Sequence, residues 1–175
     1  ERGDVVLLRR DGDGAMELRV NGIFVMDTVH TSSERMLAAT TMRQPVPEGA
    51  RVLIGGLGLG FTLAEVLTDE RVGEVHVVEI EPAVVEWNQA GLVPETASAL
   101  RDERVRLTLG DVREVLSAAQ PESFDVILLD VDNGPGYLVY DANAAVYEHA
   151  FLALCRDKLS TGGLLTVWSA DPSAE

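Results

Sequence analysis

Basic residues are scarce in this sequence: 14 lysines and arginines stand against 29 aspartates and glutamates, which gives a formal net charge of −15 at pH 7. Proteins that bind nucleic acid gain most of their affinity by neutralising phosphates, so a chain this acidic is expected to repel that partner. A negative surface attracts and steers small cationic molecules instead. We therefore expect no nucleic-acid partner, and the charge weakly favours a cationic substrate.

Cysteine is nearly absent as well. The single cysteine, Cys155, cannot form a disulfide within the chain, which fits a reducing compartment, and we expect a cytoplasmic protein. In the segment AFLALCRDKL it lies at helical spacing from Phe151 and Leu159. No adjacent histidine or lysine pattern would lower the pKa of its thiol, so the sequence predicts a buried core residue and not a nucleophile.

Long apolar runs are missing too. No run reaches the roughly 18 apolar residues that a membrane-spanning helix needs, so no membrane partner is expected. The hydrophobic share of 46% and the charged share of 25% are those of an ordinary globular domain and argue against disorder. The sequence begins at Glu1 without a methionine, and we expect it to be part of something longer.

The histidines and tryptophans suggest no site of their own. His30, His76 and His149 do not have the spacing of metal ligands, so they are predicted to be structural or surface residues and no metal is expected. Trp87 and Trp168 are assigned to core or interface packing, in preference to a platform on which bases stack.

The first thirty residues alternate apolar runs with turn dipeptides. Asp-Gly occurs twice at 11–14, and Asn21-Gly22 follows the next run, which is typical of tight hairpins and predicts a small antiparallel meander. Thr31-Ser-Ser-Glu34 has the pattern of a capping box that opens a short helix. The segment QPVPEG then breaks the chain, and we expect two parts: an N-terminal meander with its helix at 1–45, and a nucleoside-binding domain at 46–175 that lacks the last strands of its fold.

From residue 50 on, strands alternate with helices. Apolar strands are predicted in RVLIGG, EVHVVEIE, RVRLTLGD, FDVILLD and LLTVWS. Pro82 suits the first turn of one helix and Asp111 the cap of the next, and a long helix is expected over 141–158, stopped by Gly162-Gly163. This order predicts right-handed crossovers. The expected fold class is α/β: a doubly wound, mainly parallel, Rossmann-like sheet, preceded by the small β meander.

In such sheets ligands bind outside the carboxyl ends of the strands. The first predicted strand ends in the glycine loop Gly55-Gly56-Leu57-Gly58-Leu59-Gly60, whose glycines allow a ligand to approach the backbone. Its spacing is not that of the dinucleotide fingerprint, and no P-loop lysine follows. Glu79 ends the second strand, where an acid can accept both hydroxyls of a ribose. Asp111 either only caps its helix or also faces an adenine amino group, and both interpretations stay open.

The fourth strand ends in Asp130, followed by Asp132 and Asn133 in an Asn-Gly-Pro-Gly turn. Taken alone, this pattern is typical of ordinary turn residues. Since the other strands also place glycine or an acid at the same edge, we favour a functional interpretation of these acids.

Four segments in this order carry a resemblance to a known family: VLIGGLGLGFTLAEVL, VHVVEIEPAVVE, VRLTLGDVREVL and FDVILLDVDNGP. Together they resemble the polyamine aminopropyltransferases, the spermidine synthase family. The resemblance covers most of residues 20–168, including NGIFVMDTVHTSSERMLA. The glycine loop and the acid of the second strand also occur in class I S-adenosylmethionine methyltransferases, so the specific signal is the order of the segments and the β-rich piece before them.

The resemblance implies that the ligand is decarboxylated S-adenosylmethionine. It implies that the loop glycines lie near the sulfur-bearing chain, that Glu79 binds the ribose, and that Ile80 and the pair Asp111-Val112 contact adenine; the loop glycines are Gly55, Gly56, Gly58 and Gly60. It also implies that Asp130, with Asp132 and Asn133, lies beside the reacting centre. A primary amine attacks the carbon next to a sulfonium there, so a carboxylate is needed to orient the amine and to take its proton.

Four positions depart from the family pattern. Leu59 aligns with the aspartate that grips the ammonium of the donor. Ser33 and Glu34 align with a Tyr-Gln pair of the entry helix. Asn133 aligns with the second acid of the loop after the fourth strand, with Asp132 as the alternative. The nucleoside half of the predicted site is therefore intact, and its polyamine half is altered.

We therefore expect a spermidine synthase-like transferase that moves an aminopropyl group to a small-molecule amine, a polyamine among the candidates. Two alternatives stay open: a small-molecule methyltransferase that uses S-adenosylmethionine, favoured by Leu59, and a catalytically weak nucleoside-binding homologue, favoured by the altered amine site. The co-substrate is expected to be decarboxylated S-adenosylmethionine or S-adenosylmethionine. A homo-oligomer, a dimer, is also expected.

Overall fold

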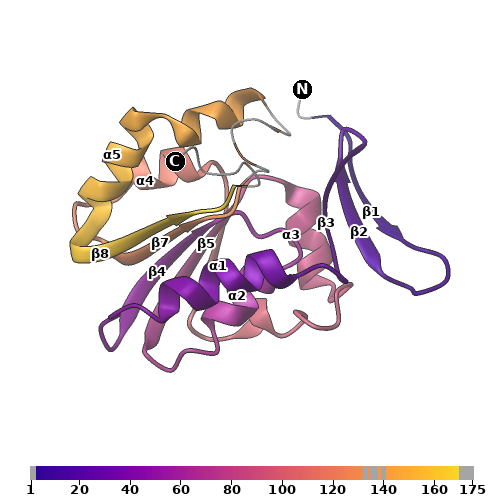
Figure 1. Ribbon diagram of the computed structural model, residues 1–175, viewed down its shortest axis with the longest axis horizontal. Coiled ribbons are helices and arrows are strands. Elements are labelled where there is room, and N and C mark those ends of the chain that lie inside the picture. Colours follow the sequence, from indigo (N-terminus) through magenta and orange to yellow (C-terminus); the bar gives the residue numbers. More distant parts are fainter. Residues whose placement is uncertain (1–2, 132–133, 135–137, 139–140, 170–175) are drawn as a thin grey trace.

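The computed structural model describes residues 3–131, 134, 138 and 141–169. This part of the chain forms a small antiparallel sheet near the N-terminus and a larger parallel sheet with helices on both faces (Figure 1). Asp132 and Asn133, two of the three predicted catalytic residues, lie outside the described residues.

The small sheet is built from three consecutive strands in the order β1-β2-β3: Val5–Arg9, Met16–Val20 and Ile23–Asp27. The two residues between β2 and β3, Asn21 and Gly22, have φ angles of 53° and 77°. Two successive positive φ angles define the type I′ turn, whose twist matches that of the flanking strands. The predicted meander is therefore confirmed, together with the reason for its Asn-Gly turn.

The large sheet contains five parallel strands: β4 Ala50–Gly55, β5 Val72–Glu79, β6 Val105–Leu109, β7 Phe124–Leu129 and β8 Leu159–Val167. Their spatial order is β6-β5-β4-β7-β8, so the chain moves outward from β4 first in one direction and then in the other. This order is that of a doubly wound fold, and the direction reverses between β4 and β7. The predicted fold class is confirmed.

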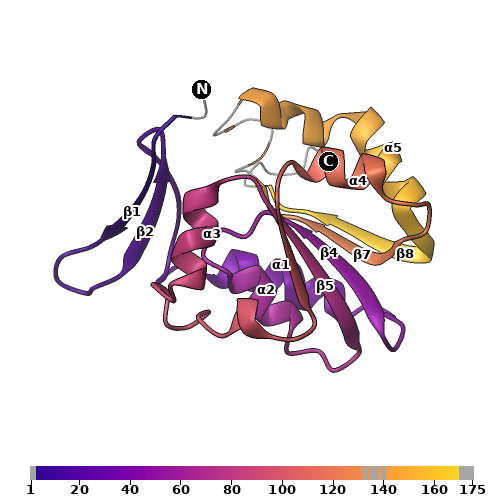
Figure 2. The same cartoon turned by 180° about the vertical axis from the view of Figure 1, so that it is seen from behind.

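Helices cover the large sheet on both faces. Figures 1 and 2 show α1, α2 and α3 on one face and α4 and α5 on the other, with the small sheet standing beside α3. The helices are α1 Ser32–Met42, α2 Phe61–Val66, α3 Pro82–Gln89, α4 Val112–Ala118 and α5 His149–Lys158, with short 3₁₀ helices at Ala99–Arg101 and Asp141–Tyr147.

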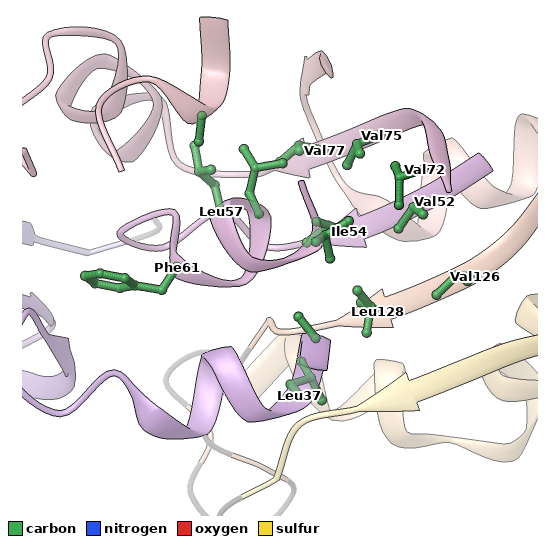
Figure 3. Packing of buried hydrophobic residues seen from close by; sticks show 14 of the residues in the cluster. Leu37, Val52, Ile54, Leu57, Phe61, Val72, Val75, Val77, Val126 and Leu128 are labelled. Carbon is green, nitrogen blue, oxygen red and sulfur yellow. The ribbon is translucent and has the colours of Figure 1, made fainter. Parts of the chain in front are cut away.

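Successive side chains of the buried strands alternate between two apolar cores. In β4, Val52 and Ile54 belong to the core under α1, α2 and α3, whereas Leu53 belongs to the core under α4 and α5 (Figure 3). Side chains of one strand point alternately to its two faces, so strands covered on both sides read as continuous apolar runs. Each fully buried Val, Leu or Ile contributes about 1.5–3 kcal/mol of transfer free energy.

The segment 141–167 differs from its prediction. The expected long helix is divided into the 3₁₀ helix Asp141–Tyr147 and α5, because Glu148 between them is extended, with φ −75° and ψ 146°. Gly162 and Gly163 do not stop the helix, since β8 begins directly after Lys158 and contains both glycines. The register between β7 and β8 shifts there, and Gly162, with φ 81°, tolerates the bulge.

The helix boundaries show which predicted signals hold. Pro82 occupies the first turn of α3, as predicted. The predicted capping box before α1 is wrong: Thr31 is the N-cap residue, but its side chain makes no capping hydrogen bond. The Glu34 side chain, in the first turn of α1, is therefore not part of a capping box.

The helix α1 packs against the large sheet, although it belongs to the N-terminal part of the chain. Thr41 of α1 and Thr166 of β8 place their hydroxyl oxygens 2.7 Å apart. The division into 1–45 and 46–175 stays a prediction. No helix in the described ranges combines the length and the apolarity that crossing a bilayer would require.

Candidate functional site

The carboxyl ends of the five parallel strands form one continuous row. The backbone N–H groups of Gly110, Gly56, Asp130 and Trp168 each donate to a carbonyl at the end of the neighbouring strand, at 2.8 to 2.9 Å. Gly110 thereby pairs with Glu79. The residues that end or follow the strands therefore lie side by side at the edge where ligands bind in this class of fold.

A cavity opens at this edge next to the switch between β4 and β7. Its wall includes Asp130 and most of the predicted nucleoside-binding residues, namely Gly56, Gly58, Glu79, Ile80, Asp111 and Val112. Two predicted residues are not on the wall: Gly55 is the last residue of β4, and Gly60 directly precedes α2. The structure thus brings together side chains that are dispersed over 75 positions of the sequence, from residue 56 to residue 130.

The glycine loop passes close to the end of β7. Gly56 has a φ of 92°, and a Cβ atom at this position would lie 2.0 Å from the carbonyl oxygen of Asp130. No side chain fits in that space, so only glycine allows the loop to cross here. Gly60 also has a positive φ, of 85°, at the point where the chain turns into α2. The glycines therefore set the path of the loop as well as the access to its backbone.

Glu79 lies at the tip of β5 and is only 6% exposed. Burial raises the pKa of its carboxyl group, whereas backbone N–H groups around it act in the opposite direction. The Leu57 N–H donates to Oε2 at 2.8 Å and the Glu81 N–H donates to Oε1 at 2.7 Å. These bonds fix the glycine loop to the end of the strand, and the backbone N–H groups of Ile80 and Gly58 also act on this carboxylate.

Asp111 caps α4, a role that its two interpretations share. Its Oδ1 accepts the N–H of Arg113 at 2.8 Å, and the guanidinium of Arg113 lies 2.5 Å from Oδ2. Both residues are on the cavity wall. The ion pair holds the Asp111 carboxylate in place at the end of the cavity near β6, and the contact with adenine stays a prediction.

Asp130 follows β7 and faces the same side of the sheet as α1 and α2. The hydroxyl of Thr62, in α2, donates to its Oδ2 at 2.7 Å. Burial raises the pKa of Asp130 to about 6; the Thr62 hydrogen bond opposes this rise, and the carboxylates of Glu34 and Glu79 add to it. An acid with a pKa this close to neutrality is suited to exchange a proton with a substrate.

Glu34 is a residue of this cavity to which the sequence assigned no role, beyond its departure from the family pattern. It is 8% exposed, it lies on the cavity wall, and its Oε2 accepts the hydroxyl of Ser33 at 2.7 Å. The buried residues of α1 show the signal that could have identified it, since Glu34, Leu37, Ala38 and Thr41 form one helical stripe. An acid on an otherwise inward-facing stripe indicates a polar interior surface.

Trp168 is the second residue that was missed. It packs against the core under α1, as expected for a core residue, but it also lines the cavity. It lies two positions after Thr166, so its side chain is expected on the same face of β8, the face that contacts α1. The aromatic ring therefore belongs to the cavity wall as well as to the core.

Leu59 does not line the cavity. It is 1% exposed and belongs to the core under α1, α2 and α3. The sulfur of Met26, from β3 of the small sheet, accepts its N–H at 3.3 Å, and Met26 is itself on the cavity wall. The interpretation that Leu59 replaces a ligand-contacting acid is not supported by this placement, and the methyltransferase alternative loses that argument.

The remaining candidate groups lie elsewhere. Cys155 is fully buried in the core under α4 and α5, where burial raises the pKa of its thiol to about 11, as expected for an inert thiol. His76 is buried and faces Thr108 at 2.8 Å, away from the cavity. Among the described residues, no group of three histidine, cysteine or carboxylate side chains could hold a metal ion.

Comparison with known proteins identifies the family of the chain. Residues 30–175 match the model of the spermine/spermidine synthase domain. Putrescine N-methyltransferase 2 of Nicotiana tabacum is 33% identical over 122 residues, which cover 69% of this chain and 32% of that protein. A polyamine aminopropyltransferase of Mycobacterium tuberculosis (strain ATCC 25618 / H37Rv) is 28% identical over 145 residues, which cover 81% of this chain and 27% of that protein. The chain thus spans about a third of these relatives.

Solved structures resemble the fold over most of its length. Spermidine synthase in complex with the transition state analogue AdoDATO has a TM-score of 0.79 at 24% identity, over 93% of this chain and 53% of that chain. Spermidine synthase from Thermotoga maritima has a TM-score of 0.77 at 24% identity, over 93% and 52% respectively. At these identities the likeness shows the fold alone.

Proposed function

The chain belongs to the spermine/spermidine synthase family, and on this basis we propose that it is a transferase that binds an adenosyl sulfonium nucleoside and moves its aminopropyl group to a primary amine. The observation that carries the proposal is the convergence of Gly56, Glu79 and Asp130 on one cavity at the switch point of the sheet. Each of the three supplies what one part of the reaction needs.

The proposed roles in nucleoside binding follow the wall of the cavity. Glu79 accepts the two ribose hydroxyls with its carboxylate, which the N–H groups of Leu57 and Glu81 hold at the tip of β5. Asp111 receives the adenine amino group, and Ile80 and Val112 contact the faces of the ring. The backbone at Gly56 and Gly58 approaches the sulfur-bearing chain, and Gly55 and Gly60 support this loop from outside the cavity wall.

The proposed chemistry is a displacement at carbon. The nitrogen of the amine attacks the carbon next to the sulfonium, a C–N bond forms, and the C–S bond breaks with its electron pair going to sulfur. Methylthioadenosine leaves as a neutral thioether, and the proton of the amine goes to Asp130. A positioned base of suitable pKa contributes typically 10²–10⁴-fold to such a step. Asp132 and Asn133 are proposed to assist from the loop that follows.

A second candidate is methyl transfer from S-adenosylmethionine to an amine. It is favoured by the relatives from Nicotiana, whose names state putrescine N-methylation. The same cavity serves both reactions in principle, because they differ in which carbon on the sulfonium is attacked. The amine acceptor is proposed to be a polyamine such as putrescine in either case. The third possibility, a catalytically weak homologue, predicts nucleoside binding without turnover.

Titration calorimetry tests the binding half of the proposal. The protein is titrated with methylthioadenosine, decarboxylated S-adenosylmethionine and S-adenosylmethionine. We expect methylthioadenosine and the decarboxylated nucleoside to bind, with inosine as a control that does not. Absence of heat with all three sulfur nucleosides would contradict the proposed function.

Location and assembly also belong to the proposal. A cytoplasmic protein is supported by the single cysteine, Cys155, which is buried. A homo-oligomer is supported by apolar side chains exposed on β1 and β3 of the small sheet, namely Val6, Leu8, Ile23 and Phe24.

A further inference from the structure

We propose that Glu34 is an acceptor-binding residue, and that its carboxylate and that of Asp130 together hold the reacting nitrogen of a protonated primary amine, with the indole of Trp168 beside them. The inference rests on the proposed function and deepens it, because it assigns the end of the cavity that receives the amine. Three residues from α1, the end of β7 and the end of β8 form this part of the wall.

The backbone positions bring the two acids close together. The Thr62 hydroxyl oxygen lies 2.7 Å from Oδ2 of Asp130 and 3.4 Å from the carbonyl oxygen of Glu34. One hydroxyl group of α2 is therefore within reach of both α1 and the end of β7. Both residues also lie on the wall of the same cavity, and the Glu34 carboxylate raises the pKa of Asp130.

The Glu34 carboxylate is buried without a cation. Ser33 donates to its Oε2, and no other described residue donates to it. The neighbouring Arg35 is directed elsewhere, with its guanidinium 5.1 Å from the centre of the Phe61 ring and 3.4 Å from Glu65. A buried carboxylate is stabilised by a positive partner, and its loss of hydration is uncompensated without one. The protonated amine supplies the missing charge.

The arginine on the cavity wall does not supply this positive charge either. Arg113 is the cationic side chain of the wall within the described ranges, and it is paired with Asp111. The part of the wall that holds Glu34 and Asp130 is thus strongly negative, which selects ammonium groups over neutral or anionic acceptors.

Trp168 completes the recognition of an alkylammonium group. An indole face attracts a cation within about 6 Å of its centre and also packs against the methylene groups next to the nitrogen. The backbone N–H of Trp168 donates to the carbonyl of Leu129 at 2.9 Å, so the backbone of Trp168 lies directly next to the end of β7, where Asp130 follows. An amine between the two carboxylates would contact this ring with its hydrocarbon part.

The reaction then needs no additional group. The ammonium binds between Glu34 and Asp130, and one proton moves from nitrogen to Asp130. The neutral nitrogen attacks the carbon of the donor, the C–N bond forms, and the C–S electron pair goes to sulfur. Glu34 accepts the remaining N–H groups of the nitrogen and holds them toward the cavity wall.

The test measures amine binding to protein saturated with methylthioadenosine, with two probes, n-butylamine and putrescine. If Glu34 contacts the reacting nitrogen, Glu34→Gln should weaken both probes by the same factor, about tenfold or more, which is typical of losing a hydrogen bond to a charged group. Glu65→Gln is the matched control, because it removes the same charge from neighbouring helix α2 outside the cavity.

Two results would overturn the inference. Equal affinity of wild type and Glu34→Gln for both amines would overturn the inference, and a loss confined to putrescine would also overturn it, since Glu34 would then hold the distal nitrogen. Methylthioadenosine itself should bind all three proteins within a few-fold. If wild type does not bind methylthioadenosine, the proposed function fails; if it binds the nucleoside and Glu34→Gln binds amines normally, the inference alone fails.

A second readout separates binding from mere structural support. The groups that shift the pKa of Asp130 are the carboxylates of Glu34 on α1 and Glu79 on β5, and the hydroxyl of Thr62 on α2. Glu34 raises the pKa of Asp130, so Glu34→Gln should move the low-pH limit of amine binding to lower pH. An unchanged limit would contradict the proposed pairing.

Discussion

The hydroxyl of Thr62 donates a 2.7 Å hydrogen bond to Oδ2 of Asp130, across 68 positions of the sequence. The bond fixes the carboxylate toward α1 and α2 rather than toward solvent. It also works against the burial that raises the pKa of Asp130 to about 6. Position and protonation of the proposed base are therefore set by a residue on the helix that follows the glycine loop.

The first prediction concerns Asp130→Asn and the pH dependence of stability. The folded-state pKa of about 6 lies above the ordinary value of 3.8, so the folded chain holds this proton more tightly than the unfolded chain. Its contribution to stability is present below about pH 4 and is lost as the pH rises through about 6. The Asn variant should therefore melt at the same or a higher temperature than wild type at pH 8, and this advantage should vanish at pH 4.

The same variant should lose activity but keep the nucleoside. Asparagine still accepts the Thr62 hydrogen bond, so methylthioadenosine affinity should stay within a few-fold. Amine-dependent turnover should fall by about 10² or more, the usual scale for losing a general base. An Asn variant that melts much earlier at pH 8 and keeps its activity would show that Asp130 is only a turn residue.

The second prediction concerns Glu79. Its carboxylate accepts two loop N–H groups and is proposed to accept the ribose, so Glu79→Ala should weaken methylthioadenosine binding about tenfold or more. The melting temperature should fall as well, because the Leu57 and Glu81 amides lose their acceptor. Glu74→Gln, at the exposed beginning of the same strand, is the control and should change neither quantity. Unchanged nucleoside affinity in Glu79→Ala would refute the ribose assignment.

The third prediction concerns Asp111→Asn. Asparagine is as good a helix cap as aspartate, so the loss of stability should be limited to the half-buried ion pair with Arg113. If Asp111 receives the adenine amino group, wild type should prefer methylthioadenosine over methylthioinosine, and the variant should lose that preference. Competition binding with the two nucleosides measures it, and an unchanged preference would leave Asp111 with its capping role alone.

The fourth prediction tests whether the Leu59 side chain is buried in the core, as in the structure, or contacts the donor, as its alignment with the family implies. Leu59 is buried in the core, so Leu59→Asp should place an unpaired charge in an apolar environment and destabilise the protein severely. Leu59→Met, which conserves volume, should cost less than about 1.5 kcal/mol. A folded Leu59→Asp protein with a stronger preference for decarboxylated S-adenosylmethionine would contradict the structural placement of this residue.

The position of the cavity was predictable because it depends on strand ends. Once β4, β5 and β7 are recognised as parallel strands, Gly56, Glu79 and Asp130 must meet at one edge, whatever the details of packing. The turn at Asn21-Gly22 was predictable for an equally local reason, the need for two positive φ angles.

The part of the cavity wall formed by Glu34 and Trp168 was not predictable from local pattern. Glu34 and Trp168 line the same cavity because α1 packs across β8, as the contact between Thr41 and Thr166, 125 positions apart, shows. Leu59 was misjudged because alignment gives its place in the loop but not the direction of its side chain. In the structure that side chain lies in the core under α1, α2 and α3, while the backbone N–H of Leu59 donates to Met26 of the small sheet.

The most direct measurement is product analysis of one reaction set. The protein is incubated with putrescine and with either decarboxylated S-adenosylmethionine or S-adenosylmethionine, and the amine products are identified by mass spectrometry, with Asp130→Asn as the inactive control. We predict aminopropylated putrescine and methylthioadenosine from the decarboxylated donor. A methylated amine from S-adenosylmethionine would contradict aminopropyl transfer in favour of methyl transfer, and the absence of any amine product from both donors would contradict a transferase.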